Sequence, residues 1–236
     1  MQVFFYVDCG IIIPMEKQIE KRYDCIIFDF DGTLADSGEI SMKAINSMAE
    51  KYGFRNIGWD DVNKMRTMSV NERCVYMGVP MIKIPFFATD FYSYYKTHMD
   101  DLRLYPGVRE LILKLHEEGY CLAVLSSNSE NNIRHFFEQN DITHFRHIIC
   151  SNHIFSKDTM INRFVRRNSI DKSRILYIGD ELRDIEACKR AGVDVVWVDW
   201  GLDIKSTIIP AKPDFMVSEP DEIYKIVKEG GIPDEA

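Results

Sequence analysis

Six apolar runs of strand length recur along the chain, and they are continuous rather than alternating with polar residues. A continuous apolar run is typical of a strand that is covered on both faces of its sheet. The runs occupy residues 25–30, 120–127, 147–151, 175–180, 194–200 and 214–218. This pattern predicts a buried sheet whose strands come from well-separated parts of the chain.

Segments of helix length lie between most of these runs. In residues 107–118, apolar side chains recur at i, i+3, i+4 and i+7, which predicts an amphipathic helix that ends before Gly119. We expect further helices over residues 129–139, 181–191 and 220–229. Strands that alternate with helices favour an α/β fold, here a Rossmann-like, doubly wound parallel sheet.

Residues 37–105 interrupt this alternation, because they contain no convincing buried strand. Their signals are helical, with an apolar face that includes Ile40 and Ala44 and a later aromatic-rich stretch over residues 85–99. Aromatic residues at helical spacing more often indicate core packing than a binding site. We therefore expect three parts: an N-terminal extension (1–21), an α/β core domain (22–36 and 106–230) and a helical insert (37–105).

Composition and charge exclude several classes of protein. The chain has 236 residues, a net charge of −8 and a pI of about 5.3, and its basic residues are scattered, so we expect no nucleic-acid partner. An anionic substrate would need local cations to overcome that charge. The six cysteines form no CxxC pair, which favours buried thiols in a reducing, cytoplasmic location.

From the sequence of the N-terminal extension we expect no membrane contact. Its apolar run is too short to span a bilayer and contains Asp8, and the features of a signal peptide are missing. Met15 is an alternative start of the chain. We assign the extension no chemistry.

Polar side chains follow three of the predicted strands. In a doubly wound sheet, ligands bind beyond the carboxyl ends of the strands. A single aspartate there is more often a turn former, but several such residues on buried strands are harder to dismiss. The residues are Asp29 and Asp31 after the first run, Ser126, Ser127 and Asn128 after the second, and Asp180, Glu181 and Asp184 after the fourth.

Carboxylates gathered at one sheet edge would repel one another and raise each other's pKa. Mg²⁺ relieves this repulsion and prefers oxygen ligands, commonly carboxylates, waters and a substrate phosphate. Because residues i and i+2 of a strand point to the same side, Asp29 and Asp31 are expected to face one ligand together. Gly32 would allow the backbone to turn there, and Thr33 would bond locally.

These residues resemble the motifs of the haloacid dehalogenase superfamily. DFDGT (29–33), Ser126 at the end of a second strand, Lys157, and GDELRD (179–184) occur in the family's order. The resemblance covers residues 22–36 and 106–229. The position of the insert is similar to that of the helical cap in the phosphoglycolate phosphatase and β-phosphoglucomutase-like branch. The interval between Lys157 and Asp180 fits one helix and one strand.

The resemblance implies a role for each matching residue. Asp29 would be the nucleophile that becomes an aspartyl-phosphate, and Asp31 the general acid and base, whose backbone carbonyl also binds the metal. Ser126 and Lys157 would bind the phosphoryl group. The implied ligands of Mg²⁺ are Asp29, Asp31, Asp180 and Asp184, and the implied substrate-binding residues are Gly32, Thr33, Arg66, Ser127 and Asn128.

The leading hypothesis is a Mg²⁺-dependent hydrolase of a small phosphorylated metabolite, similar to phosphoglycolate phosphatase and either monomeric or homodimeric. Asp31 disfavours dehalogenation, since a halide leaving group needs no protonation. A β-phosphoglucomutase-like sugar phosphomutase and a catalytically idle binding or regulatory protein are the alternatives. In the insert, Arg66 is the candidate contact to a substrate carboxylate or hydroxyl. Thr67, Met68 and Ser69 replace the glycine expected in the following loop, which disfavours phosphoglycolate itself.

Overall fold

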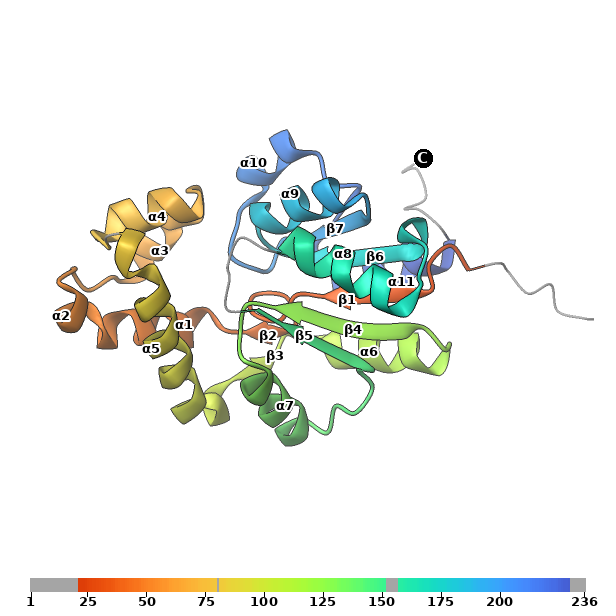
Figure 1. Cartoon of the computed structure of the whole chain (residues 1–236), viewed down its shortest axis with the longest axis horizontal. Coiled ribbons are helices and arrows are strands. Elements are labelled where there is room, and N and C mark those ends of the chain that lie inside the picture. The colour runs from red at the N-terminus through yellow and green to blue at the C-terminus, as the bar shows by residue number, and fades with distance from the viewer. Residues whose placement is uncertain (1–20, 80, 152–156, 230–236) are drawn as a thin grey trace, which may run out of the picture.

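The computed structural model describes residues 21–79, 81–151 and 157–229. It contains a parallel six-stranded sheet with the strand order β5-β4-β1-β6-β7-β8 (Figure 1). The strands are β1 (Cys25–Phe28), β4 (Cys121–Ser126), β5 (His147–Cys150), β6 (Ile175–Gly179), β7 (Asp194–Val198) and β8 (Phe215–Val217). The predicted α/β fold is therefore confirmed. Residues 1–20 of the predicted N-terminal extension, including Met15, lie outside the described residues.

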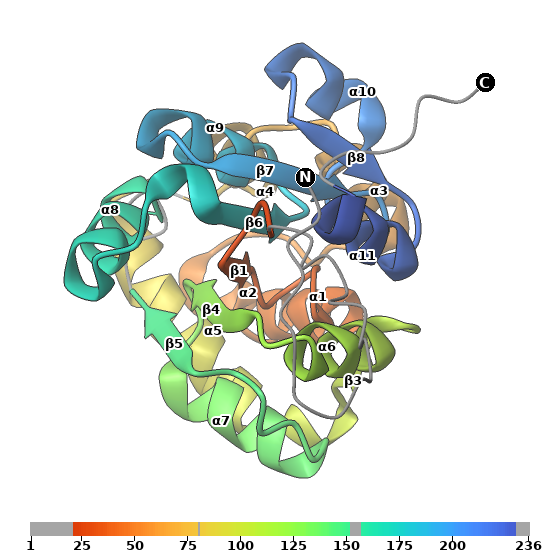
Figure 2. The ribbon, with the colours of Figure 1, turned by 90° about the vertical axis from the view of Figure 1, so that its right-hand side faces the viewer.

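The two faces of the sheet are covered by different helices (Figure 2). Ile26 and Phe28 of β1 pack with α6 (Val108–Glu117), α7 (Glu130–Gln139) and α11 (Pro220–Glu229). Cys25 and Ile27 point to the other face, which is covered by α8 (Lys157–Asn168), α9 (Leu182–Ala191) and α10 (Lys205–Ile208). Burial on both faces explains why the strands read as continuous apolar runs.

The predicted helices after residues 106, 128, 180 and 219 are observed to within one residue at each end. Local signals explain this agreement. The Ser129 side chain accepts a hydrogen bond from the Asn132 amide and starts α7, and Gly192, at a φ of 74°, ends α9. α8 and β6 fill the interval between Lys157 and Asp180, and short 3₁₀ turns lie at Met81–Lys83, Met99–Asp101, Lys172–Arg174 and Ile209–Ala211.

The apolar runs extend past the strands that they form. β1 ends at Phe28, although its run continues to Phe30. The Asp29 side chain accepts a hydrogen bond from the Phe30 amide at 2.8 Å, and the Phe30 carbonyl accepts bonds from the amides of Leu34 and Ala35 at 3.0 Å. This turn removes Asp31 from the pleat of the strand.

Residues 37–105 are largely helical, and we refer to them as the cap. They contain α1 (Gly38–Ser47), α2 (Ala49–Tyr52), α3 (Trp59–Met65), α4 (Val70–Met77) and α5 (Ile84–Thr97), which gather on one side of the sheet domain (Figure 1). A second, two-stranded sheet was not predicted: β3 (Arg103–Leu104) pairs antiparallel with β2 (Ala35–Asp36) where the chain enters and leaves the cap. Within the described residues, no helix has the length and apolar character needed to cross a membrane.

Candidate active site

Three buried carboxylates meet at the carboxyl ends of the two central strands. Asp29 follows β1, Asp180 follows β6, and Asp184 lies in the first turn of α9. Each offers an oxygen within 4.8 Å of the oxygens offered by the other two. The register explains the convergence, because Phe28 pairs with Ile178 and the Asp29 amide donates to the Ile178 carbonyl at 2.8 Å.

Lys157 faces this cluster from the first residue of α8. Its Nζ donates to Asp29 Oδ2 at 2.6 Å and to Asp184 Oδ1, and the side chain is only 4% exposed. Burial lowers the pKa of Lys157, but the negative charges of Asp184 and Asp29 outweigh it and leave the pKa raised. The ammonium group therefore stays charged inside the protein and holds the two carboxylates together.

One lysine does not compensate three carboxylates. Burial, followed by repulsion from neighbouring carboxylates, raises the pKa of Asp180 well above its usual value. Burial also raises the pKa of Asp29 to about 7, against the opposing effect of Lys157. Such shifts mean that the charged forms lack solvation. A divalent cation that prefers oxygen ligands would supply the missing charge compensation, and the closely spaced oxygens fit such an ion.

Two glycines let the backbone pass close to Asp180. Gly32 has a φ of +78°, and a Cβ built on it would lie 2.3 Å from Asp180 Oδ2. A Cβ on Gly201 would lie 2.1 Å from the Cβ of the same aspartate. Asp180 is fixed between these segments, since its carboxylate accepts bonds from Thr33 Oγ1 at 2.9 Å and the Leu202 amide at 2.8 Å.

The Asp31 side chain lies outside the cluster of three carboxylates, because the turn at Phe30 ends the pleat that would have aligned it with Asp29. Its Oδ2 accepts a bond from Asn128 Nδ2 at 3.0 Å, and its buried Oδ1 has no hydrogen-bond partner among the described residues. Burial raises the pKa of Asp31. A carboxyl group with a raised pKa is suited to donate a proton.

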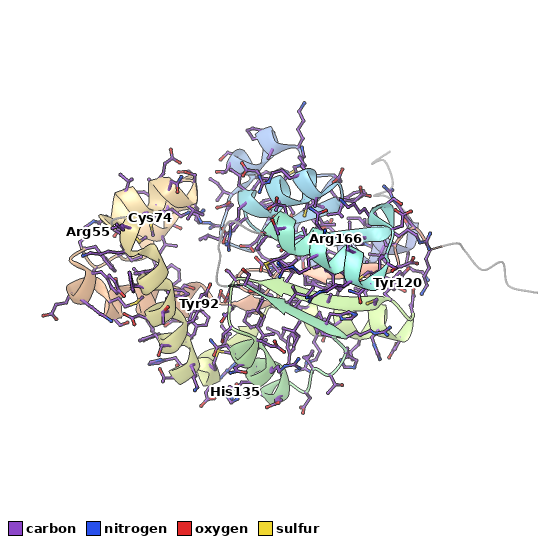
Figure 3. The ribbon with its side chains drawn as sticks, in the orientation of Figure 1. Arg55, Cys74, Tyr92, Tyr120, His135 and Arg166 are labelled. Atoms are coloured by element: carbon purple, nitrogen blue, oxygen red, sulfur yellow. The ribbon has the colours of Figure 1, made fainter. Side chains whose placement is uncertain are left out.

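The residues that follow β4 complete the core side of the site. Ser126 is buried, and its Oγ accepts a bond from the Asn128 amide at 3.0 Å. Ser127 Oγ accepts a bond at 3.0 Å from the hydroxyl of Tyr92, which points from α5 toward the sheet domain (Figure 3). A cavity of about 420 Å³ lies between the cap and this edge, with Asp31, Ser127 and Asp180 in its lining.

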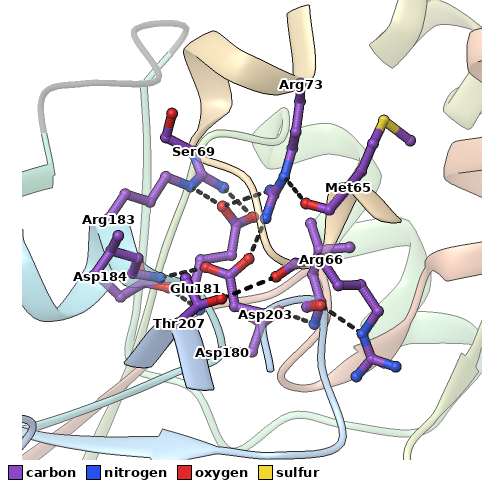
Figure 4. A network of polar contacts seen from close by, with 12 residues as sticks. Met65, Arg66, Ser69, Arg73, Asp180, Glu181, Arg183, Asp184, Asp203 and Thr207 are labelled. Carbon is purple, nitrogen blue, oxygen red and sulfur yellow. Dashed lines mark hydrogen bonds and ion pairs between the residues drawn. The ribbon is translucent and has the colours of Figure 1, made fainter. Parts of the chain in front are cut away.

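A second polar network joins the cap to the core beside Asp180 (Figure 4). We call its members Arg66, Arg73, Glu181 and Asp203 the cap–core clasp. Arg73 of α4 forms an ion pair with Asp203, lies 3.7 Å from Glu181, and donates to the Met65 carbonyl at 2.9 Å. Asp203 also accepts a bond from the Leu182 amide at 2.7 Å, so the clasp touches the helix that carries Asp184.

Arg66 belongs to this clasp and also lines the cavity. Its Nε donates to the Leu202 carbonyl at 2.8 Å and its Nη2 to the Gly201 carbonyl at 3.1 Å. The structure therefore gives Arg66 partners in the core, and its predicted contact with substrate stays a prediction.

Most of the predicted site residues converge on one edge of the sheet. Asp29, Lys157, Asp180 and Asp184 share one cluster, Asp31 and Asn128 bond to each other beside it, and Gly32 and Thr33 contact Asp180. The roles assigned to these residues stay predictions, as does the boundary of the cap.

Sequence reasoning missed Arg73, Arg183, Asp203 and Tyr92. Asp203 could have been identified, because it follows the predicted strand at 194–200 and ligands bind beyond the carboxyl ends of such strands. Arg183 and Tyr92 were missed because each lies in a predicted helix among similar charged or aromatic residues, and nothing in the sequence distinguishes it from them. Nothing in the sequence around Arg73 links it to a residue 130 positions later.

Comparison with known proteins agrees with this arrangement. The sequence profile of a family described as "Haloacid dehalogenase-like hydrolase" matches residues 26–198. The phosphoglycolate phosphatase of Synechococcus elongatus is 30% identical over 207 residues, which cover 86% of this chain and 96% of the relative. That of Vibrio cholerae is 25% identical and covers 88% and 98%.

A solved structure shares the fold. The crystal structure of a predicted phosphatase from Clostridium acetobutylicum superposes with a TM-score of 0.77 at 21% identity. The similarity covers 88% of this chain and 99% of that chain, so it includes both the sheet and the helices of the cap.

Proposed function

We infer that this chain, which belongs to the haloacid dehalogenase-like hydrolase family and is a phosphatase of that family, hydrolyses the phosphomonoester of a small metabolite through an aspartyl-phosphate. The single observation that carries the proposal is the contact of Lys157 with Asp29 inside a cluster of buried carboxylates. A buried carboxylate beside one cation is both positioned to attack phosphorus and able to share its charge with the phosphoryl group.

The residues present fit Mg²⁺. The cluster places three carboxylates against one bonded lysine, and its side chains offer oxygen atoms only. Asp29, the backbone carbonyl of Asp31, and Asp180 would hold the ion, with Asp184 supporting it. When bound, the ion would neutralise charge on the carboxylates and on the phosphoryl oxygens.

The first step transfers the phosphoryl group to Asp29. A carboxylate oxygen of Asp29 forms a bond to phosphorus, and the bond between phosphorus and the alcohol oxygen breaks with its electron pair on that oxygen. Asp31 gives the departing oxygen its proton, which the raised pKa of this carboxyl makes available. Lys157 and Ser126 bind the phosphoryl oxygens and stabilise their negative charge.

The second step releases phosphate. Asp31, now a carboxylate, accepts a proton from a water molecule whose oxygen forms a bond to phosphorus. The bond between phosphorus and the Asp29 oxygen breaks, which returns both aspartates to their starting states. Asn128 keeps Asp31 in place through its bond to Oδ2. Gly32 and Ser127 line the phosphoryl end of the cavity, and Thr33 donates a hydrogen bond to Asp180.

The proposal is tested by following inorganic phosphate release from a panel of phosphorylated metabolites. We expect release with Mg²⁺, loss of release in EDTA, and recovery when Mg²⁺ is restored. Transfer of the group to a second sugar phosphate, instead of to water, would indicate a phosphomutase. Unchanged rates in EDTA would rule out the metal.

The intermediate is tested separately by reduction with borohydride during turnover, which converts an aspartyl-phosphate to homoserine. We expect peptide mass spectrometry to locate homoserine at position 29. A modified residue at any other position would refute the assignment of Asp29 as nucleophile.

A further inference from the structure

The cavity between cap and core has a polar end, and apolar and aromatic side chains make up much of the rest of its lining. Its polar end carries Asp31, Ser127 and Asp180, where the phosphoryl group is proposed to react. The remainder includes three methionines, several aliphatic side chains and six aromatic ones, namely Trp59, Phe91, Tyr92, Tyr95, Tyr105 and Trp200. At about 420 Å³, it is larger than a two-carbon leaving group needs and falls within the range of cavities that hold larger organic ligands.

The aromatic lining begins next to the reacting end. Trp200 donates from Nε1 to the Thr33 carbonyl at 3.2 Å, and the Thr33 hydroxyl bonds to Asp180. The ring of Tyr105 lies 6.3 Å from the ring of Trp200. An alcohol that departs from phosphorus would therefore meet aromatic surface at once.

The cap side of the cavity presents an exposed aromatic ring. Trp59, the first residue of α3, is 52% exposed although it lines the cavity, and its ring lies beside Gly38 at the start of α1. Covering a large aromatic side chain with a ligand favours binding, because apolar surface is removed from water. Tyr95, by contrast, is fully buried and bonded to Ser41, so it forms a fixed part of the lining.

The cations in the described lining already have partners. Arg73 pairs with Asp203, and Arg183 donates twice to Glu181, at 2.7 and 3.0 Å. Arg66 donates to the carbonyls of Gly201 and Leu202. A carboxylate on the leaving group would also face the carboxylates of the lining, which are Asp31, Asp36, Asp180 and Glu181.

We propose that the leaving alcohol of the substrate is an uncharged aromatic or similarly apolar group, rather than a small carboxylic acid. This inference rests on the proposed phosphatase function and specifies its substrate class. The phosphoryl group binds at the strand ends, and the apolar group fills the space between Trp59 of the cap and Trp200 of the core.

The test compares three esters of primary alcohols: benzyl phosphate, ethyl phosphate and 2-phosphoglycolate. Benzyl and ethyl phosphate both release a primary alcohol, so their comparison isolates the ring and not the reactivity of the leaving group. We expect kcat/KM for benzyl phosphate to exceed that for ethyl phosphate by about tenfold or more. We expect 2-phosphoglycolate to be the poorest of the three.

Variants locate the preference. Trp59→Ala is expected to lower the ratio of kcat/KM for benzyl to ethyl phosphate by about tenfold, and Trp59→Phe to restore most of it. Phe86→Ala is the matched control, because Phe86 is an exposed aromatic residue of the cap that does not line the cavity, and it should keep the ratio of the wild type. A Trp59→Ala protein with an unchanged ratio would overturn the placement of the ring.

Binding gives a readout that is independent of turnover. With Mg²⁺ present, benzylphosphonate should quench the tryptophan fluorescence of the wild type and bind at least tenfold more tightly than phosphonoacetate. A preference for 2-phosphoglycolate and phosphonoacetate, lost in Arg66→Gln, would overturn the inference while leaving the phosphatase function intact. Hydrolysis of none of the three esters, together with no phosphate release from the panel of phosphorylated metabolites, would overturn both.

Discussion

The two walls of the cavity are held in opposite ways. The core wall consists of the residues that follow β1, β4 and β6, and nearly every polar side chain there has a partner, as Asp29 has in Lys157 and Asp180 has in Thr33. The cap wall, apart from the two arginines of the clasp, is made largely of apolar residues of α1, α3 and α5, such as Met42, Trp59 and Phe91, and Phe91 packs against the ring of Tyr95. Hydrogen bonds fix atoms to within a narrow range, whereas packing fixes a shape. We therefore expect the core wall to determine the reaction and the cap wall to determine which ester is accepted.

The largest expected effect is that of Asp29→Asn, because an amide is a poor nucleophile. We expect kcat to fall by about a thousandfold or more with every ester, without a change in the order of preference. Phosphate release and a thermal melt are the measurements. The exposed Asp221→Asn serves as the control, and more than a tenth of wild-type turnover in Asp29→Asn would contradict the division between the walls.

Lys157→Gln is expected to have the next largest effect. Losing the cation that faces Asp29 and Asp184 should lower kcat by about a hundredfold, because the phosphoryl oxygens lose a charged partner. The metal-free variant should also be about 3 kcal/mol less stable, since buried carboxylates are left uncompensated. Urea unfolding in EDTA measures this, with Lys205→Gln, an exposed lysine of α10, as the comparison. A Lys157→Gln protein with unchanged stability and unchanged kcat would show that the contact contributes to neither.

Arg73→Gln tests whether the clasp serves the cap wall. It removes the ion pair with Asp203 that joins α4 to the core, so we expect KM to rise about tenfold with a small change in kcat. Arg55→Gln removes an exposed ion pair within the cap and should change neither constant. A large fall in kcat at constant KM would instead place Arg73 with the reacting groups.

The smallest expected effect is a pH dependence of stability from Asp203. Burial raises the pKa of Asp203 from 3.8 to about 6, so between these values the folded protein holds a proton that the unfolded chain has lost. Stability from this group is therefore present at low pH and is lost as pH rises toward 6. Compared with Asp203→Asn, the wild type should lose a few degrees of melting temperature between pH 4 and 6 in EDTA. A difference that stays constant over this range would contradict the assignment.

The core wall could be predicted from the sequence because each of its residues lies next to a strand. The apolar runs placed Asp29, Ser126 and Asp180 at one sheet edge, and the parallel register then brought two of them together. Asp31 was expected to face the same ligand as Asp29, but its side chain lies beside the cluster and not in it. A run of apolar residues does not reveal the turn at Phe30 that causes this.

The cap wall and the clasp could not be predicted in the same way. Helical periodicity indicates which residues are apolar, but the packing of several helices decides whether Trp59 faces the core of the cap or the cavity. Arg66 was singled out for substrate, yet its partners are backbone carbonyls, which have no signature in a sequence. The pairing of Arg73 with Asp203 depends on the docking of two separate parts of the chain.

Gly201 has a consequence for exchanging parts between related enzymes. The segment from Gly201 to Thr207 crosses directly above Asp180, and it also supplies the carbonyls and the carboxylate that receive the two arginines of the cap. A chimera that grafts only residues 37–105 onto a related core domain would therefore lack the segment that binds the cap arginines. Such a transplant should take residues 201–207 along with it, although they lie almost a hundred positions downstream.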